Sequence, residues 1–290
     1  MPSNMILPGS ASQALAAALA DATDEPLATV EYQTFPDGEL LVSVDALAEE
    51  TPERAVVVAS TVTSDAHLEL LQLQDAAREA GVDEVVTVVP YMGYARQDSA
   101  FKAGQPVSAR AVAAAVSSGT DRVVLVNPHE EAIAEFFDVP CDTVDAASVL
   151  ADPLPPKLAD PLFLSPDSGA IALAETVRDA YGTGDVDYFE KERDYDTGDV
   201  EVSPSDAGVE DRDVVLVDDI IATGSTMSES IDVLHERGVG GVFVTCVHPL
   251  LAANARTKLA SAGVDGLYGT DTIERDVSTA SVANVLAETL

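Results

Sequence analysis

Short valine-rich runs alternate with alanine-rich amphipathic stretches along the whole chain, and this alternation constrains the fold more than any other feature. The apolar runs predict strands at residues 55–60, 85–90, 123–127, 162–165, 214–217 and 242–247. The stretches between them predict helices at residues 12–20, 67–80, 108–117, 169–180, 226–237 and 253–262. Continuous apolar strands that alternate with helices are typical of parallel sheets covered on both faces. The sequence therefore predicts an α/β fold.

The strand runs fall into two groups of three, and this grouping predicts two similar domains. A chain of 290 residues is also the length expected for two domains of ordinary size. We place the domains at residues 1–145 and 146–290, and the proline-rich segment 152–161 could mark the passage between them. Residues 91–107 and 185–212 read as long connections, which in compact domains tend to be functional.

The chain carries an extreme acidic excess, with 51 Asp and Glu against 15 Lys and Arg and a net charge of −36. Such a chain cannot form the basic footprint that nucleic-acid binding requires. At molar salt the screening length falls to about 3 Å, so the self-repulsion that opposes folding in dilute buffer largely disappears. Because lysine is also scarce, we predict a salt-adapted, halophilic protein. The alternative is an acidic protein from an organism without salt adaptation.

The remaining composition favours a protein without disulfides or membrane anchors. Cys141 and Cys246 lie far apart without CxxC spacing, so we expect both to be small core residues. The N-terminal stretch lacks the basic region of a signal peptide, and no run reaches the roughly 18 apolar residues of a membrane span. We expect a soluble, cytoplasmic protein with no membrane partner.

The stretch VVLVDDIIATGST, Val214 to Thr226, carries the chemistry. An apolar strand ends in Asp218 and Asp219, and the turn Ala222–Thr226 leads into a predicted helix. Backbone N–H groups and hydroxyls at such a helix start can surround a phosphate, while the carboxylates can accept hydrogen bonds from ribose hydroxyls or attract magnesium. The alternative is an ordinary turn with solvated acids. Neither GxxxxGK[ST] nor GxGxxG occurs in the sequence.

This stretch resembles the phosphoribosyl diphosphate signature of type I phosphoribosyltransferases. Four further stretches, FPDGE, PYMGYARQD, NPHEEAIAEFFDVP and SPDSG, stand in the order and spacing of ribose-phosphate diphosphokinases, also called pyrophosphokinases. The resemblance covers nearly the whole chain and implies two domains of the type I phosphoribosyltransferase kind, an ATP side followed by a ribose 5-phosphate side. It implies transfer of the β,γ-diphosphoryl group of ATP to the 1-hydroxyl of ribose 5-phosphate, with Mg²⁺, giving 5-phosphoribosyl 1-diphosphate and AMP for nucleotide biosynthesis.

The resemblance assigns roles to particular residues. The catalytic residues are Lys191 and Arg193. The ATP-binding residues are Phe35, Asp37, Gly38, Glu39, Arg96, Gln97 and Asp98. The ribose 5-phosphate-binding residues are Arg193, Asp218, Asp219, Ala222, Thr223, Gly224, Ser225 and Thr226. The metal-site residues are His129 and Asp167, and His248 is expected to support the structure.

Several of these residues have plainer interpretations when the resemblance is set aside. Lys191 and Arg193 are two apart, so on an extended segment they share one side, but a solvated charge-paired hairpin fits equally. His129 after a strand is more often a structural hydrogen-bonding group. FPDGE alone is a type I or II turn before a strand at residues 40–44.

The family also implies a homo-oligomer, because its FPDGE loop reaches into the site of a neighbouring subunit. Asn127, Ser168 and Ala222 depart from the bacterial pattern, which puts the outer metal shell and any allosteric phosphate or ADP site in doubt. Two other functions stay open at this point. A phosphoribosyltransferase with a base acceptor explains only the stretch 214–226, and a catalytically silent regulatory homologue has no need of the residues assigned to catalysis and metal binding.

Overall fold

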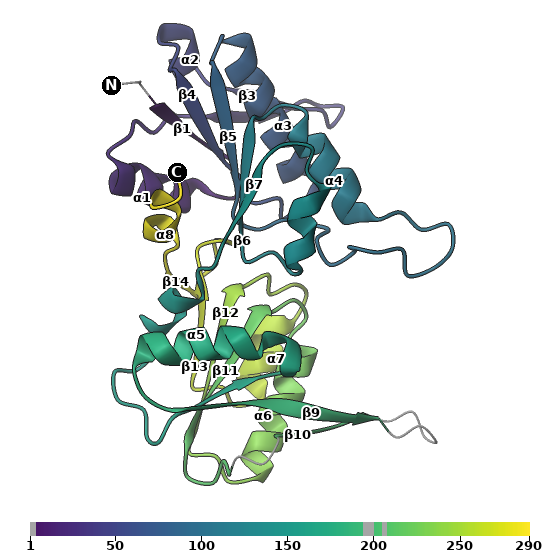
Figure 1. Ribbon diagram of the computed structural model, residues 1–290, viewed down its shortest axis with the longest axis vertical. Coiled ribbons are helices and arrows are strands. Elements are labelled where there is room, and N and C mark those ends of the chain that lie inside the picture. The colour runs from purple at the N-terminus through teal and green to yellow at the C-terminus, as the bar shows by residue number, and fades with distance from the viewer. Residues whose placement is uncertain (1–3, 194–199, 205–207) are drawn as a thin grey trace. The chain divides into compact units, whose positions relative to one another are not determined.

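The computed structural model describes residues 4–193, 200–204 and 208–290, which divide into two compact units (Figure 1). Unit 1 comprises the described part of Met1–Asp145 together with Asp271–Glu274 and Ser281–Leu290. Unit 2 comprises the described part of Ala146–Thr270 together with Arg275–Ala280. Each unit is a mainly parallel sheet flanked by helices, so the predicted α/β class is confirmed. No helix in the described ranges is both long and apolar enough to cross a bilayer.

Unit 1 has the strands β1 (Asn4–Pro8), β2 (Glu31–Thr34), β3 (Leu40–Ser43), β4 (Arg54–Val58), β5 (Glu84–Val89), β6 (Arg122–Val126) and β7 (Cys141–Val144). Its helices are α1 (Gln13–Thr23), α2 (Ala46–Glu49), α3 (Ser64–Glu79), α4 (Ser108–Ser117), the 3₁₀ helix η1 (Glu131–Phe136) and α8 (Ala283–Ala287).

Unit 2 has the strands β8 (Leu162–Ser165), β9 (Asp185–Arg193), β10 (Val200–Pro204), β11 (Asp213–Ile220), β12 (Gly241–His248), β13 (Gly266–Thr270) and β14 (Ser278–Ala280). Its helices are the 3₁₀ helices η2 (Ala147–Ala151) and η3 (Ser168–Ala170), followed by α5 (Ile171–Tyr181), α6 (Ser225–Glu236) and α7 (Ala255–Ser261).

The main sheet of unit 1 is parallel throughout, with strand order β1-β4-β5-β6-β7. Apart from Thr87 and the charged residue that begins each strand, the central strands β4, β5 and β6 are apolar, as expected for strands covered on both faces. On one face, Val57 belongs to the same core cluster as Leu70 and Leu73 of α3. Val56, which alternates to the other face, is fully buried as well. Helix α1 follows β1 and contacts α8 from the C-terminal end of the chain (Figure 1).

The C-terminal residues therefore return to unit 1, whereas the sequence prediction placed the whole of 146–290 in one domain. Glu274 accepts hydrogen bonds from the N–H groups of Ala14 (2.6 Å) and Leu15 (3.2 Å) at the start of α1. These N–H groups have no acceptor within their own helix, because they belong to its first turn. A carboxylate about 260 positions away in the sequence serves as their acceptor. The segment 152–161 lies inside unit 2 and not at a boundary between the units.

The sheet of unit 2 has strand order β10-β9-β8-β11-β12-β13-β14 and is parallel except for the β9–β10 pair. The prediction of a long connection over residues 185–212 was wrong, because this stretch contains β9 and β10. In β9, Asp185 and Asp187 alternate with the partly buried Val186 and Tyr188, and Phe189 is 1% exposed. This strand is more polar than the mostly apolar strands β8 and β11 beside it, and its acidic residues made it look like a connection.

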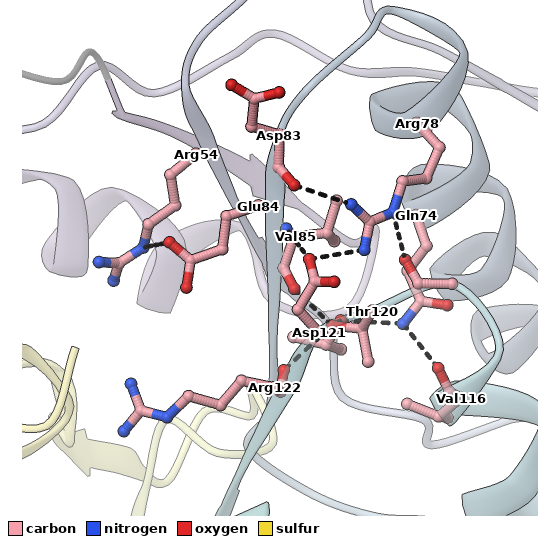
Figure 2. A network of polar contacts seen from close by, with 12 residues as sticks. Arg54, Gln74, Arg78, Asp83, Glu84, Val85, Val116, Thr120, Asp121 and Arg122 are labelled. Carbon is pink, nitrogen blue, oxygen red and sulfur yellow. Dashed lines mark hydrogen bonds and ion pairs between the residues drawn. The ribbon is translucent and has the colours of Figure 1, made fainter. Parts of the chain in front are cut away.

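A polar network ties α3 to the amino ends of β5 and β6 (Figure 2). The carboxylate of Asp121 accepts hydrogen bonds from the N–H of Val85 (2.8 Å) and from Nη2 of Arg78 (2.6 Å). Arg78 also donates to the carbonyls of Gly119 (3.3 Å) and Asp83 (3.2 Å). One carboxylate and one guanidinium thus hold two strand starts and a helix end together, at the sheet edge opposite the strand carboxyl ends.

We expect Asp121→Ala to lower the free energy of unfolding by about 1–3 kcal/mol, because the N–H of Val85 and the Arg78 guanidinium lose an acceptor. Denaturant unfolding measures this loss. Asp83→Ala is the matched control, because it removes an exposed carboxylate with no side-chain partner among the described residues. Equal destabilisation by both variants would contradict a specific role for the network.

Candidate active site

Three carboxylates of unit 2 meet at one edge of its sheet. Asp167 follows β8, and Asp218 and Asp219 lie near the end of β11. The two strands pair in parallel with Leu164 opposite Leu216, so their carboxyl ends reach the same edge. Burial, together with the negative charges of Asp219 and Asp167, raises the pKa of Asp218 to about 8. Asp218 therefore keeps its proton near neutral pH unless a cation or a hydrogen-bond donor stabilises the carboxylate.

Local hydrogen bonds fix the orientation of these acids. Asp218 accepts from the N–H of Asp219 at 2.9 Å, and Asp219 accepts from the N–H of Ile220 at 2.7 Å. Asp167 accepts from the N–H of Gly169 at 3.0 Å, which caps η3. Each carboxylate thus accepts a backbone hydrogen bond, and an ionised carboxylate has acceptor positions for several partners.

The predicted phosphate turn lies directly after β11. Gly224 adopts a left-handed conformation with φ of +69°, and α6 begins at Ser225. The conformation favours glycine, and an added Cβ would also stand 3.4 Å from Cβ of Ala255. The hydroxyls of Thr223 and Ser225 lie 3.4 Å apart, and Thr223 and Thr226 are exposed. The first N–H groups of α6 and these hydroxyls form a set of donors suited to an anion.

The predicted catalytic pair lies on β9, next to β8 in the sheet. The backbone of Lys191 pairs with Val202 of β10, and that of Arg193 pairs with Val200. The side chains of Lys191 and Arg193 lie outside what the structure describes. Their assignment to catalysis stays a prediction.

In unit 1, the FPDGE residues form the turn between β2 and β3. Gly38 N–H donates to the carbonyl of Phe35 (2.9 Å), and Phe35 N–H donates to the carbonyl of Glu39 (2.8 Å). Asp37 has no positive φ, so of the two predicted turn types the structure has the type I-like form, followed by Gly38 at φ of +95°. Gln72 of α3 makes two 2.8 Å hydrogen bonds to the main chain of β3. The turn is therefore presented by an anchored hairpin.

The other predicted ATP residues follow β5. Arg96 is exposed, and Asp98 accepts a hydrogen bond from Ser99. The Gln97 amide donates to the carbonyl of Pro106 at 3.2 Å and accepts from the hydroxyl of Ser108. Gln97 thus closes the base of the connection before α4, a structural role that the motif did not reveal.

The two predicted metal residues belong to different units, with exposed His129 after β6 in unit 1 and Asp167 in unit 2. Within the described ranges, no group of three or more His, Cys, Asp and Glu side chains could hold a metal ion by itself. Magnesium is usually held by one or two carboxylates together with water and substrate phosphates. The repulsion among Asp167, Asp218 and Asp219 suits such a cation, because positive charge would relieve it.

Family models match both parts of the chain. Residues 4–118 match the N-terminal domain of ribose phosphate pyrophosphokinase, and residues 157–279 match a phosphoribosyl transferase domain. A ribose-phosphate pyrophosphokinase of the halophile Halobacterium salinarum is 61% identical over 286 residues, which cover 99% of this chain and 100% of the relative. The chain belongs to the ribose-phosphate pyrophosphokinase family.

More distant members agree with this assignment. The ribose-phosphate pyrophosphokinase of Methanothermobacter thermautotrophicus is 42% identical over 289 residues and covers 99% of each chain. The crystal structure of phosphoribosylpyrophosphate synthetase from Mycobacterium smegmatis matches 99% of this chain and 97% of that chain, with a TM-score of 0.81 and 27% identity. The resemblance inferred from the motifs is confirmed, and with it the fold of two phosphoribosyltransferase-type parts.

Sequence reasoning missed one residue beside the phosphate turn. The Nζ of Lys258, on α7, donates to the hydroxyl of Ser225 at 2.8 Å. The two residues are 33 positions apart, so no local pattern relates them.

The raised pKa of Asp218 predicts a pH-dependent stability. Its folded-state pKa of about 8 lies above the ordinary value of 3.8. The stability that the protonated Asp218 carboxyl contributes to the folded state is therefore fully present below about pH 4 and is lost as pH rises through 8. We expect Asp218→Asn to gain stability over the wild type as pH increases from about 4 to 8, measured by denaturant unfolding without divalent cations. Asp232→Asn, at an exposed position on α6, is the control. A pH-independent difference for Asp218→Asn would contradict the raised pKa.

Proposed function

We propose that this family member transfers the β,γ-diphosphoryl group of ATP to the 1-hydroxyl of ribose 5-phosphate, forming 5-phosphoribosyl 1-diphosphate and AMP. The observation that carries the proposal is the phosphate turn 222–226 beside converging carboxylates, in a chain 61% identical to a ribose-phosphate pyrophosphokinase. The bond between O1 of the sugar and the β-phosphorus forms as the bond to the leaving AMP oxygen breaks, and the proton of the 1-hydroxyl is released to water. The product suits nucleotide biosynthesis.

We assign the sugar phosphate to unit 2. The N–H groups at the start of α6 and the hydroxyls of Thr223, Ser225 and Thr226 donate to its phosphate. Asp218 and Asp219 accept hydrogen bonds from ribose hydroxyls, which replaces part of the hydration that burial removes. Orientation by two kinds of contact holds the 1-hydroxyl in one position, as in-line attack requires.

We assign the nucleotide to unit 1. Phe35 is 37% exposed and offers an apolar surface to the base, while Asp37 and Glu39 accept hydrogen bonds from the base or ribose. Arg96 supplies planar donors for phosphate. Gly38 allows the backbone conformation of this turn, and the exposed connection that begins at Asp98 is suited to cover the triphosphate.

The transferring group accumulates negative charge, which cations must stabilise. We assign that role to Lys191 and Arg193 on β9. Bound Mg²⁺ would neutralise and orient the triphosphate. Asp167 and His129 are the residues proposed to hold it, with His129 acting directly or through water.

The proposal extends to assembly and location. We propose a homo-oligomer in which the FPDGE turn, Phe35 to Glu39, completes the ATP site of a neighbouring copy. The exposed side of Phe35 and the anchored hairpin behind it are consistent with such a contact. We place the protein in the cytoplasm, where its substrates are found.

We expect Lys191→Ala to lower formation of AMP and diphosphorylated sugar by about 100- to 1,000-fold, because it removes charge stabilisation from the transferring group. Phosphorus NMR of protein with ATP, ribose 5-phosphate and Mg²⁺ in molar KCl measures this. Lys157→Ala, at an exposed position of unit 2, is the matched control. Turnover by Lys191→Ala equal to that of the control would remove Lys191 from the mechanism. No product from ATP and ribose 5-phosphate, but release of diphosphate from 5-phosphoribosyl 1-diphosphate and a purine or pyrimidine base, would indicate a base-acceptor transferase.

Salt should help substrate binding. ATP and ribose 5-phosphate are anions, and they approach a chain of net charge −36, so long-range repulsion slows their encounter in dilute buffer. We expect both KM values to fall as KCl rises toward molar concentration. Circular dichroism across the same range is the control for folding. KM values that rise steadily with KCl would contradict this account.

A further inference from the structure

Lys258 lies on α7 and contacts the phosphate turn 222–226. Its Nζ donates to Oγ of Ser225 at 2.8 Å, and its side chain is partly buried. Basic residues number 15 against 51 acidic ones, yet no carboxylate among the described residues pairs with this ammonium. The positive charge of Lys258 is therefore directed at a hydroxyl of the turn and is not neutralised by a neighbouring acid.

The segment that carries Lys258 is fixed to the same turn. The N–H of Ala252 donates to the carbonyl of Ala222 at 2.8 Å. Ala255, the first residue of α7, packs against Gly224, where an added Cβ would lie 3.4 Å from the alanine Cβ. These contacts fix the start of α7 beside the phosphate turn, and Lys258 lies one helical turn after Ala255. Its bond to Ser225 therefore belongs to the packed structure and not to a free surface lysine.

The chemistry of the Lys258–Ser225 hydrogen bond determines which of the two groups is the donor and which is the acceptor. A lysine ammonium has three donors and no acceptor, so Oγ of Ser225 must be the acceptor. The hydroxyl then keeps its own proton for another partner. Thr223 Oγ1 lies 3.4 Å from Ser225 Oγ, and an anion bound in the turn would compete for the same proton. Lys258 thereby holds Ser225 as a donor toward the anion.

We infer that Lys258 is a positioning residue for the phosphate of the sugar substrate, an assignment that rests on the proposed function. It acts through Ser225, by orienting the hydroxyl proton, and it adds a positive charge next to the turn. The role concerns affinity for the sugar phosphate and not the chemical step.

The test compares Lys258→Met with Lys157→Met, which removes the same charge from an exposed position of unit 2. Calorimetry measures the Kd of ribose 5-phosphate in molar KCl with Mg²⁺ and α,β-methylene-ATP, so that no turnover occurs. We expect Lys258→Met to weaken binding about tenfold, equivalent to about 1.4 kcal/mol, and Lys157→Met to leave it unchanged. The KM for ribose 5-phosphate should rise by a similar factor while kcat and the KM for ATP stay within about twofold.

Two further variants separate positioning from general stability. Lys258→Arg keeps a donor and a charge, so it should recover most of the affinity. In the Ser225→Ala background, Lys258→Met should weaken binding by less than about twofold, because the hydroxyl through which it acts is absent. Thermal unfolding monitored by circular dichroism verifies that each variant is folded.

Three results would overturn the inference: unchanged binding by Lys258→Met, no recovery by Lys258→Arg when both variants are folded, or losses from Lys258→Met and Ser225→Ala that multiply. Failure of the proposed function gives a different result. In that case the wild type releases no AMP from ATP and ribose 5-phosphate, whereas the binding comparison still decides the role of Lys258.

Discussion

Parallel pairing of buried strands is the constraint on which the candidate site depends. Because β8 and β11 run in the same direction with Leu164 opposite Leu216, the residues after both strands must emerge at one edge. That register brings Asp167 near Asp218 although 50 residues of chain separate the two positions in the numbering. The apolar interior of the sheet is thus what forces like charges together, and burial beside it raises the pKa of Asp218.

Carboxylates held this close together can all be ionised only when a bound cation or hydrogen-bond donor stabilises their negative charge. A ribose hydroxyl or a metal ion can stabilise the ionised form of Asp218, so binding and ionisation are coupled there. The turn beside the acids has the opposite character, since its free N–H groups and hydroxyls favour an anion. A sugar phosphate carries both kinds of group, hydroxyls at one end and phosphate at the other. The polarity of the site therefore matches the two ends of this class of substrate.

Local patterns predicted those parts of the molecule whose cause is local. The helix predicted at 108–117 and the strand at 162–165 have these bounds in the structure, and the turn before α6 follows β11 as expected. The strand predicted at 214–217 extends to Ile220, so Asp218 and Asp219 are its last residues but two and but one and do not follow it. Features set by distant contacts escaped prediction. The return of residues 281–290 to unit 1, the β9–β10 pair and the bond of Lys258 to Ser225 each depend on a partner far along the chain. Gln97 shows the same limit, because its motif suggests a ligand while its partners are Pro106 and Ser108.

The connection after β12 has a strained backbone and makes hydrogen bonds to the phosphate turn. Leu251 and Ala253 adopt left-handed conformations with φ of 45° and 54°, which are unfavourable for residues with a Cβ by roughly 1–2 kcal/mol each. Such strain persists only where surrounding contacts require it. Here the N–H of Leu251 donates to the carbonyl of Ile221 at 2.9 Å, and the N–H of Ala252 donates to that of Ala222 at 2.8 Å. The strained connection between β12 and α7 therefore follows a conformation that hydrogen-bonds to the segment before the phosphate turn. The same conformation positions α7 so that Lys258 reaches Ser225.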